Sequence, residues 1–233
     1  MRKMIVYRLG LVEYAQAMHI QQRIFESRRG NATEDSLLIL QHFPVITIGT
    51  SGKGDHVLVD RGFLEEKGIT VCATDRGGDV TFHGPGQVIG YPILNLKGLE
   101  IKVIEYVRRI EEVIIRTLQA FDLKGRRIEG SPGVWIDHEK ICSIGFRVSR
   151  GITTHGFALN VNTDLDFFKF IVPCGIRDVS MTSMEKLINR KVDIEKVTNQ
   201  VVLNFCQLFD AEILKSDTDA EGLVATSGRE WSC

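Results

Sequence analysis

The sequence has little net charge, because 29 lysines and arginines nearly balance 30 aspartates and glutamates to leave a formal charge of −1. This balance removes the strongest reason to expect binding to nucleic acid or to an anionic membrane. No apolar run approaches the roughly 18 residues that a membrane-spanning helix needs. The first residues enter an apolar run without a small-residue cleavage site, so we expect no signal peptide and a cytoplasmic protein.

Cysteine and histidine are few, and neither shows a metal-binding spacing. The five cysteines are scattered without a Cys-x-x-Cys pair, which argues against a disulfide framework or a zinc ribbon and is typical of a reducing compartment. Cys72 lies within a buried strand pattern, and Cys233 is expected to be exposed and incidental. No two of the six histidines have the spacing of a zinc motif, so we predict no metal site.

Three common catalytic motifs are also absent. The glycines at 84–89 do not form the Gly-x-Gly-x-x-Gly pattern of dinucleotide sites. The segment 49–55 fails as a phosphate-binding loop, because Gly54 stands where Ser or Thr is required. No Gly-x-Ser-x-Gly elbow appears, so a serine hydrolase of the α/β type is not expected.

The hydrophobic pattern predicts one mixed domain. Ile110, Ile114 and Leu118 recur at four-residue steps within 101–121, which is the clearest helix. Further helices are predicted at 11–25, at 62–67 and from Asp193, which is a suitable N-cap. Strands are predicted at 36–42, 45–49, 57–60, 69–75, 88–96, 133–136, 140–148 and 152–162.

The strands arrive in groups, with helices between the groups and not after every strand. This order favours an α/β fold of the α+β type, a mixed sheet flanked by helices, over a doubly wound parallel sheet. We expect a single domain over 1–233, in which about 211–233 forms a loosely ordered polar tail.

The densest run of glycine is RGGDVTFHGPGQ at 76–87. Successive glycines let backbone N–H groups approach a carbonyl or phosphate oxygen more closely than side chains allow. Arg76 and His83 are candidates to add donors or to shape the rim, and His155 is a further candidate for lining a pocket. On composition alone, a mobile surface loop is the alternative interpretation of this segment.

Cys174 is the candidate nucleophile, because Pro173 and Gly175 flank it and would present its thiol. A free thiol with a pKa of about 8.5 is mostly protonated at neutral pH, so a nucleophilic Cys174 needs a cationic neighbour. The alternative interpretation is that Cys174 is an inert, buried thiol. Lys140 opens an apolar strand and is either held for its charge or is a solubilising lysine at a hairpin end. Cys142 shares a strand face with Lys140 but is expected to lie in the core.

Several segments together resemble one family. They are RGGDVTFHGPGQVIGY at 76–91, GVWIDHEKICSIGFRV at 133–148, THGFALNVNTDL at 154–165 and FIVPCGI at 170–176, with a looser likeness in LLILQHFPVITIG at 37–49. These segments are similar to the lipoyl(octanoyl) transferases. The likeness covers about residues 5–210, in order and at fitting spacing.

The resemblance implies the fold of the biotin and lipoate protein ligases and an acyl transfer that uses neither ATP nor another cofactor. The family takes an octanoyl (or lipoyl) group from the thioester of acyl carrier protein. It places the group on a specific lysine of the lipoyl domains of 2-oxoacid dehydrogenase complexes or of glycine-cleavage H protein. Since no exposed apolar stripe stands out, we expect a monomer.

The resemblance also assigns residues. The acyl-thioester cysteine of the family falls on Cys174, and the lysine that lowers the pKa of that cysteine falls on Lys140. The acyl-binding segments correspond to Arg76, Gly77, Gly78, Asp79, Val80, Thr81, Phe82 and His83, to Ser143, Ile144 and Gly145, and to Gly156, Phe157 and Ala158.

Three other functions stay open. An ATP-dependent lipoate or biotin ligase would carry an adenylate-binding form of the glycine segment and would not require Cys174. A non-catalytic module that binds lipoyl domains is disfavoured by the presence of both Cys174 and Lys140. A cysteine hydrolase is less favoured still, because no orienting Asn or Asp partner is evident.

Overall fold

Strands that are distant in sequence form the central sheet. The computed structural model describes residues 1–52, 54–173, 179–217 and 233. Within these residues the sheet has nine strands, on a path β12–β1–β2–β6–β10–β9–β8–β7 with β11 paired to β9. It combines parallel and antiparallel pairs, so the predicted mixed-sheet fold is confirmed. The strands are β1 (Arg2–Val12), β2 (Asp35–His42), β6 (Gln87–Ile93), β7 (Arg126–Ile128), β8 (Ser131–Ile136), β9 (Glu139–Ser149), β10 (Ile152–Asn160), β11 (Ser180–Met181) and β12 (Ala211–Asp217).

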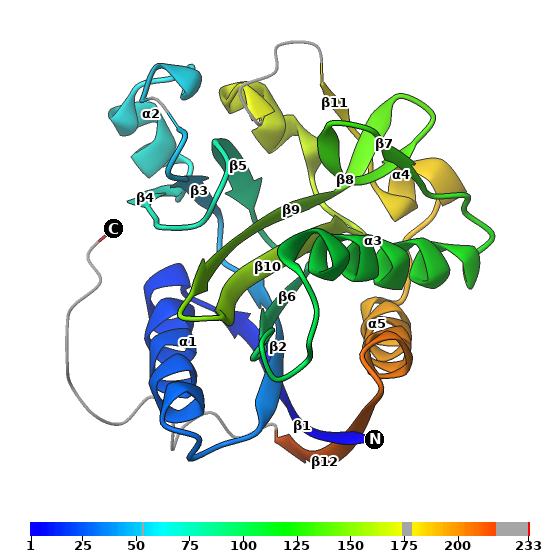
Figure 1. Ribbon diagram of the computed structural model, residues 1–233. Helices are drawn as coiled ribbons and strands as arrows, with labels where there is room; N and C mark the ends of the chain where they lie inside the picture. The colour runs from blue at the N-terminus through cyan, green and yellow to red at the C-terminus, as the bar shows by residue number, and fades with distance from the viewer. Residues whose placement is uncertain (53, 174–178, 218–232) are drawn as a thin grey trace.

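Helices cover both faces of this sheet (Figure 1). Alternation along β2 explains this, because Leu37 and Ile39 join the core that includes α3 and α5, whereas Leu38 and Leu40 join the core that includes α1. A strand buried on both faces needs an unbroken apolar run, which the segment 36–42 largely supplies. The helices are α1 (Tyr14–Arg29), α3 (Val103–Gln119), α4 (Met184–Ile188) and α5 (Ile194–Leu208).

A second sheet of three strands carries the glycine-rich segment. Its order is β4 (Thr70–Ala73), β3 (Val45–Ile48) and β5 (Val80–His83). Helix α2 (Arg61–Glu66) and the 3-10 helix η2 (Leu165–Phe170) pack on it through a small core of their own, with the 3-10 helix η1 (Gly54–His56) preceding α2. The residues 74–79, which join β4 to β5, reach the large sheet, where the N–H of Gly77 donates to the carbonyl of Phe146 on β9.

Most of the predicted helices and strands are present, but some boundaries differ. Residues 11 and 12 end strand β1, and the first helix begins only at Tyr14. The predicted strand at 57–60 is absent, and Val57 makes only an isolated bridge to Ile171. The predictions missed β5 inside the glycine-rich segment, because its glycines hid a four-residue strand. The N-cap at Asp193 is confirmed, since its carboxylate accepts hydrogen bonds from two backbone N–H groups of α5.

Part of the expected loose tail is an edge strand. Residues 211–217 form β12, which runs parallel to β1 at the end of the large sheet. The segment has no apolar periodicity, so its structure depends on the free edge that β1 offers, which local sequence cannot reveal. Residues 218–232 of the expected tail lie outside the described residues.

A disulfide joins Cys72 of β4 to Cys233, which overturns the expectation that Cys233 is incidental and that the cysteines are unpaired. The C-terminus lies near β4 in Figure 1. The two cysteines are 161 residues apart in sequence, so the absence of Cys-x-x-Cys pairs had no bearing on them. The argument for a reducing compartment from scattered cysteines therefore loses its basis.

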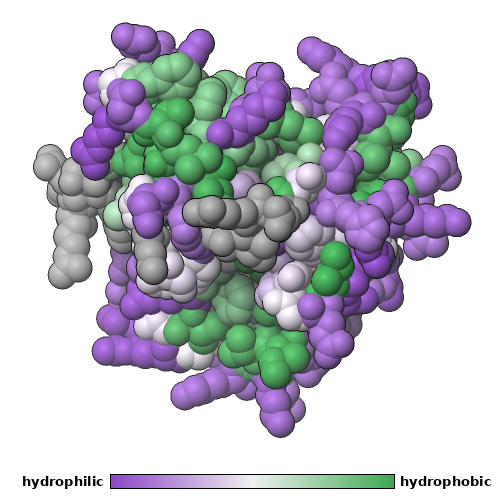
Figure 2. Space-filling model, turned by 90° about the horizontal axis from the view of Figure 1, so that it is seen from above, coloured by the Kyte–Doolittle hydropathy of each residue, from purple (hydrophilic) through white to green (hydrophobic). Residues whose placement is uncertain are grey.

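The surface carries no single apolar face in the view of Figure 2, where hydrophobic patches are separated by polar residues. Among the described residues, the most exposed large hydrophobic side chains, apart from that of Met1, are those of Ile104 on α3 and Leu58. No described helix is long and apolar enough to cross a membrane.

Candidate active site

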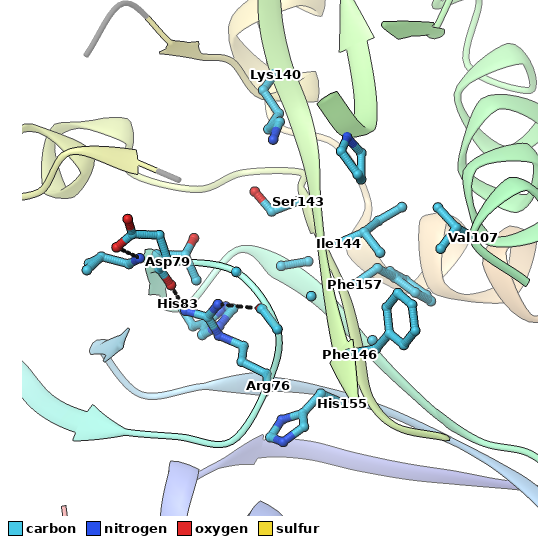
Figure 3. Close-up of a pocket in the computed structure, with 18 of the residues that line it drawn as sticks. Arg76, Asp79, His83, Val107, Lys140, Ser143, Ile144, Phe146, His155 and Phe157 are labelled. Atoms are coloured by element: carbon cyan, nitrogen blue, oxygen red, sulfur yellow. Dashed lines mark hydrogen bonds between the residues drawn. The ribbon is translucent and has the colours of Figure 1, made fainter. Parts of the chain in front are cut away.

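A cavity of about 480 Å³ lies between the glycine-rich segment and the strands β9 and β10. Lys140 stands at one end of the view in Figure 3 and His155 at the other. The cavity wall is mostly apolar, which suits a hydrocarbon ligand. The predicted site residues that line it are Arg76, Gly77, Gly78, Asp79, Val80, Thr81, His83, Lys140, Ser143, Ile144, Gly145, Gly156, Phe157 and Ala158.

Among the predicted site residues that the structure describes, Phe82 does not line the cavity. Phe82 is buried in the core of the small sheet, where its ring stacks on that of Phe167, with centroids 4.7 Å apart. Strand alternation accounts for this, because Thr81 and His83 face the cavity and Phe82 must then face the other way. Cys174 lies outside the described residues.

Arg76 holds the cavity wall together. Its guanidinium donates to the hydroxyl and the carbonyl of Thr47 on β3, the latter at 2.7 Å, and to the carbonyl of Asp79 at 2.7 Å. The side chain is buried, so these bonds form in a low dielectric, where they are strong. Arg76 therefore orders the loop that it belongs to, and it also lines the cavity.

The backbone of the same loop bridges the two sheets. The N–H of Thr50 donates to the carbonyl of Arg76 at 3.0 Å, and the N–H of Ser51 donates to that of Gly78 at 3.0 Å. On the other side, the N–H of Gly77 donates to Phe146 of β9 at 3.0 Å. These bonds argue against the alternative of a mobile surface loop. They also use the Gly77 N–H, so this donor does not point at a ligand.

Two glycines of the site are required by their surroundings. Gly78 has a φ of +89°, in the left-handed region that a side chain makes costly. A Cβ on Gly156 would lie 2.2 Å from the carbonyl oxygen of Gly90 on the neighbouring strand β6, which leaves no room for alanine. Gly78 is thus required by a turn, and Gly156 by the packing of two strands.

Lys140 is buried, with only 4% of its surface exposed. This excludes the alternative of a solubilising lysine at a hairpin end. Its Nζ atom lies 4.8 Å from the centroid of the Trp135 ring on β8. A cation at this depth is costly unless it is stabilised by its surroundings, so its position at the cavity indicates a use for the charge.

Cys142 lies in the core, as predicted. It is fully buried, and burial raises the pKa of its thiol well above the ordinary value. Since the thiolate is the nucleophilic form, Cys142 is a poor nucleophile even though it lies two residues from Lys140. The only other free cysteine among the described residues is Cys206 on α5, which does not line the cavity.

His83 is held as a neutral imidazole. The side-chain amide of Gln87 donates to the carbonyl of Phe82 and to Asn160, which leaves its oxygen to accept from Nδ1 of His83 at 3.2 Å. Burial lowers the pKa of His83 well below its ordinary value. The ring therefore carries its proton on Nδ1, and its Nε2 has a lone pair.

A second buried histidine lies behind the first. Nδ1 of His42 donates to the carbonyl of Val12 at 2.9 Å, and its Nε2 accepts from the hydroxyl of Tyr91 at 2.7 Å. Burial raises the pKa of Tyr91 well above its ordinary value, so the phenol stays protonated and donates. Burial also lowers the pKa of His42 to about 4.

Stability should therefore fall as the pH falls from about 6.5 to about 4. In this window the unfolded His42 binds a proton that the folded His42 rejects, and the difference amounts to about 3 kcal/mol. We expect His42→Gln to reduce the pH slope of the unfolding free energy, measured by urea titration at pH 7 and 4.5. His138→Gln, at an exposed turn residue, is the control. A slope that is as steep in His42→Gln as in the wild type would contradict this.

The predictions missed part of the cavity wall. Tyr14, Tyr91, Val107 and Phe146 line it, as do Gly130 and the first two residues of β8, Ser131 and Pro132. Tyr14 and Val107 come from helices on opposite faces of the sheet, so only the fold brings them together. The glycine-flanked His155 does line the cavity as predicted, and its Nε2 lies 2.7 Å from Asp75. The hydrogen bond from His155 contributes most to a lowered pKa of Asp75.

Known proteins with the same sequence pattern are acyltransferases. Residues 13–206 match the lipoyl protein ligase A/B catalytic domain. An octanoyltransferase of Koribacter versatilis is 45% identical over 214 residues, which cover 90% of this chain and 85% of that protein. The chain belongs to the octanoyltransferase family. Another octanoyltransferase, from Roseiflexus, is 41% identical over 100% of this chain and 94% of its own length.

Solved structures agree with this family at the level of the fold. A lipoate-protein ligase A bound with ATP superposes with a TM-score of 0.79 at 17% identity, covering 96% of this chain and 93% of that one. A biotin protein ligase from Aquifex aeolicus has a TM-score of 0.51 at 14% identity, over 90% of this chain and 70% of that one. The octanoyltransferase chain thus has the predicted biotin and lipoate protein ligase fold.

Proposed function

We propose that this octanoyltransferase moves an octanoyl group from acyl carrier protein to a lysine of a lipoyl domain or of glycine-cleavage H protein, through a thioester on Cys174. The observation that carries the proposal is the burial of Lys140 at the end of a mostly apolar cavity. A hydrocarbon chain fits the apolar wall, and each buried methylene contributes about 0.8 kcal/mol. A cation at the end of the wall suits a thiolate.

The first step is a thioester exchange. The thiolate of Cys174 attacks the carbonyl carbon of the donor, a new C–S bond forms, and the C–S bond to the carrier breaks. The carrier sulfur leaves as a thiolate and takes a proton from the Lys140 ammonium. One thioester replaces another, so the step is nearly balanced in energy and keeps the acyl group activated.

The second step is an aminolysis. The neutral amine of the acceptor lysine attacks the Cys174 thioester, a C–N bond forms, and Cys174 leaves as a thiolate. Lys140, now neutral, takes the proton that the amine loses and returns to the ammonium form. The strand segment Ser143, Ile144 and Gly145 lies at the cavity wall near Lys140 and is suited to hold the thioester carbonyl.

Several further features belong to the same proposal. The protein acts as a monomer and as a single catalytic domain, and it works in the cytoplasm, where its carrier and acceptor proteins are made. It needs no cofactor. A protein of the same fold, the bi-partite lipoate protein ligase of Thermoplasma acidophilum, is known together with its E2 lipoyl domain, which supports a lipoyl domain as the acceptor.

The experiment is a transfer assay without ATP. Octanoyl–acyl carrier protein and an isolated lipoyl domain are mixed with the enzyme, and the mass of the lipoyl domain is followed. We expect one octanoyl group per domain, at a rate that ATP and Mg²⁺ do not change. A requirement for ATP with free octanoate would instead identify the ligase reaction and contradict the proposal.

A further inference from the structure

The side chain of Lys140 is enclosed by two residues of the neighbouring strand β8. Trp135 lies opposite Lys140 in the β8–β9 pairing, and its ring faces the Nζ atom at 4.8 Å. Both side chains are 4% exposed, so the contact is shielded from water. Attraction between a cation and a ring face is strongest for tryptophan and grows when the pair is desolvated.

Gly133 forms the other side of the enclosure. A Cβ there would lie 2.5 Å from the carbonyl oxygen of Cys142 and 3.3 Å from Cε of Lys140, so Gly133 lets β9 and the lysine side chain come close. Its φ of +127° belongs to a bulge, at which the β8–β9 register shifts between Val134 and Trp135. The bulge allows Gly133 and Trp135 both to contact Lys140.

Hydrogen bonds fix both parts of this enclosure. The indole N–H of Trp135 donates to the carbonyl of Ser131 at 3.2 Å, which sets the plane of the ring. The N–H of Gly133 lies 3.3 Å from a carboxylate oxygen of Glu111 on α3. Glu111 is buried, and Arg108 and Arg127 balance its charge at 2.8 and 3.0 Å.

We propose that Trp135 is a positioning residue, whose ring holds the Lys140 ammonium where it can act on the cysteine. The inference rests on the proposed function, because it concerns how that lysine is used. Unlike a carboxylate, a ring face stabilises a cation without neutralising its charge.

Several other charged and titratable groups surround the Trp135–Lys140 pair. Arg126 and Arg127 lie on β7, Glu139 and the thiol of Cys142 on β9, and Asp137 in the turn between β8 and β9, whereas the helices contribute Arg108, Glu111 and Lys186. Across the cavity stand Arg76, Asp79 and His83. None of these is changed by a substitution at Trp135, so a matched pair of variants isolates the ring.

The test compares Trp135→Leu with Trp135→Phe. Both remove the indole and leave a gap, but only phenylalanine keeps a ring face. The rate at which iodoacetamide alkylates Cys174 is followed against pH by peptide mass, which keeps the other cysteines apart. We expect Trp135→Leu to slow alkylation at pH 7 by about tenfold and to shift the midpoint of the profile upward by about one pH unit, with Trp135→Phe in between.

A second measurement does not depend on Cys174. In the wild type, the ring should move the ε-CH₂ proton resonance of Lys140 upfield in the NMR spectrum. This displacement should be lost in Trp135→Leu and partly kept in Trp135→Phe. Equal alkylation profiles in the two variants, or an undisplaced wild-type resonance, would overturn the inference. An unchanged profile in Lys140→Ala would instead defeat the proposed function, and the NMR displacement would still report on the contact.

Discussion

Cys174→Ser is expected to abolish octanoyl transfer, with a loss of at least about a thousandfold, as for other enzymes that lose their nucleophile. A serine hydroxyl is not ionised at neutral pH and does not exchange with a thioester as a thiolate does. The wild-type protein mixed with octanoyl–acyl carrier protein should show one octanoyl adduct in its intact mass. The adduct should be absent from Cys174→Ser.

The control is a second free cysteine. Cys206→Ser changes a partly exposed thiol on α5 that does not line the cavity, and it should leave both the adduct and the rate unchanged. Cys142 cannot take over, because burial raises the pKa of its thiol. If Cys174→Ser still transfers the acyl group at the wild-type rate, the covalent mechanism is wrong.

Lys140→Ala should have the second largest effect, a drop of about a hundredfold in transfer at neutral pH. In the proposed mechanism the buried cation stabilises the Cys174 thiolate, so alkylation of Cys174 at pH 7 should also slow markedly in this variant. Lys186→Ala is the matched control, since this nearby lysine is half exposed and pairs with Glu139 at the surface. It should change neither rate.

Lys140→Arg separates the two roles of this lysine. Arginine keeps the positive charge but does not lose its proton near neutral pH. We therefore expect the variant to form the octanoyl adduct and to pass it slowly to the acceptor lysine. If alkylation in Lys140→Ala equals that of the wild type, Lys140 has no part in activating the thiol.

Local sequence was sufficient where the physical signal is itself local. The period of Ile110, Ile114 and Leu118 specified the long helix, the capping side chain of Asp193 marked the last one, and alternating apolar residues marked the hairpin of β8 and β9. Fixed motifs located most of the cavity wall for a similar reason, because consecutive residues of one strand or loop stay together in the fold.

Contacts between residues that are far apart in the sequence could not be predicted from local patterns. The edge strand β12 is polar and needs β1 as its partner, and the Cys72–Cys233 bond joins residues 161 positions apart. The cavity residues Tyr14 and Val107 lie on helices on either side of the sheet, so no spacing connects them. The ring of Trp135 was missed because an apolar residue in a strand is ordinarily core, and only the bulge at Gly133 sets it over a lysine.

The attachment of Arg76 to Thr47 bears on how this cavity can be re-engineered. Thr47 is fully buried and does not line the cavity, yet its hydroxyl and carbonyl receive the guanidinium. The cavity wall therefore depends on two segments of the chain, because Thr47, which accepts the hydrogen bonds of Arg76, lies on β3, 29 residues earlier in the sequence. A designer who grafts the glycine-rich loop into a related scaffold must therefore transplant the threonine with it.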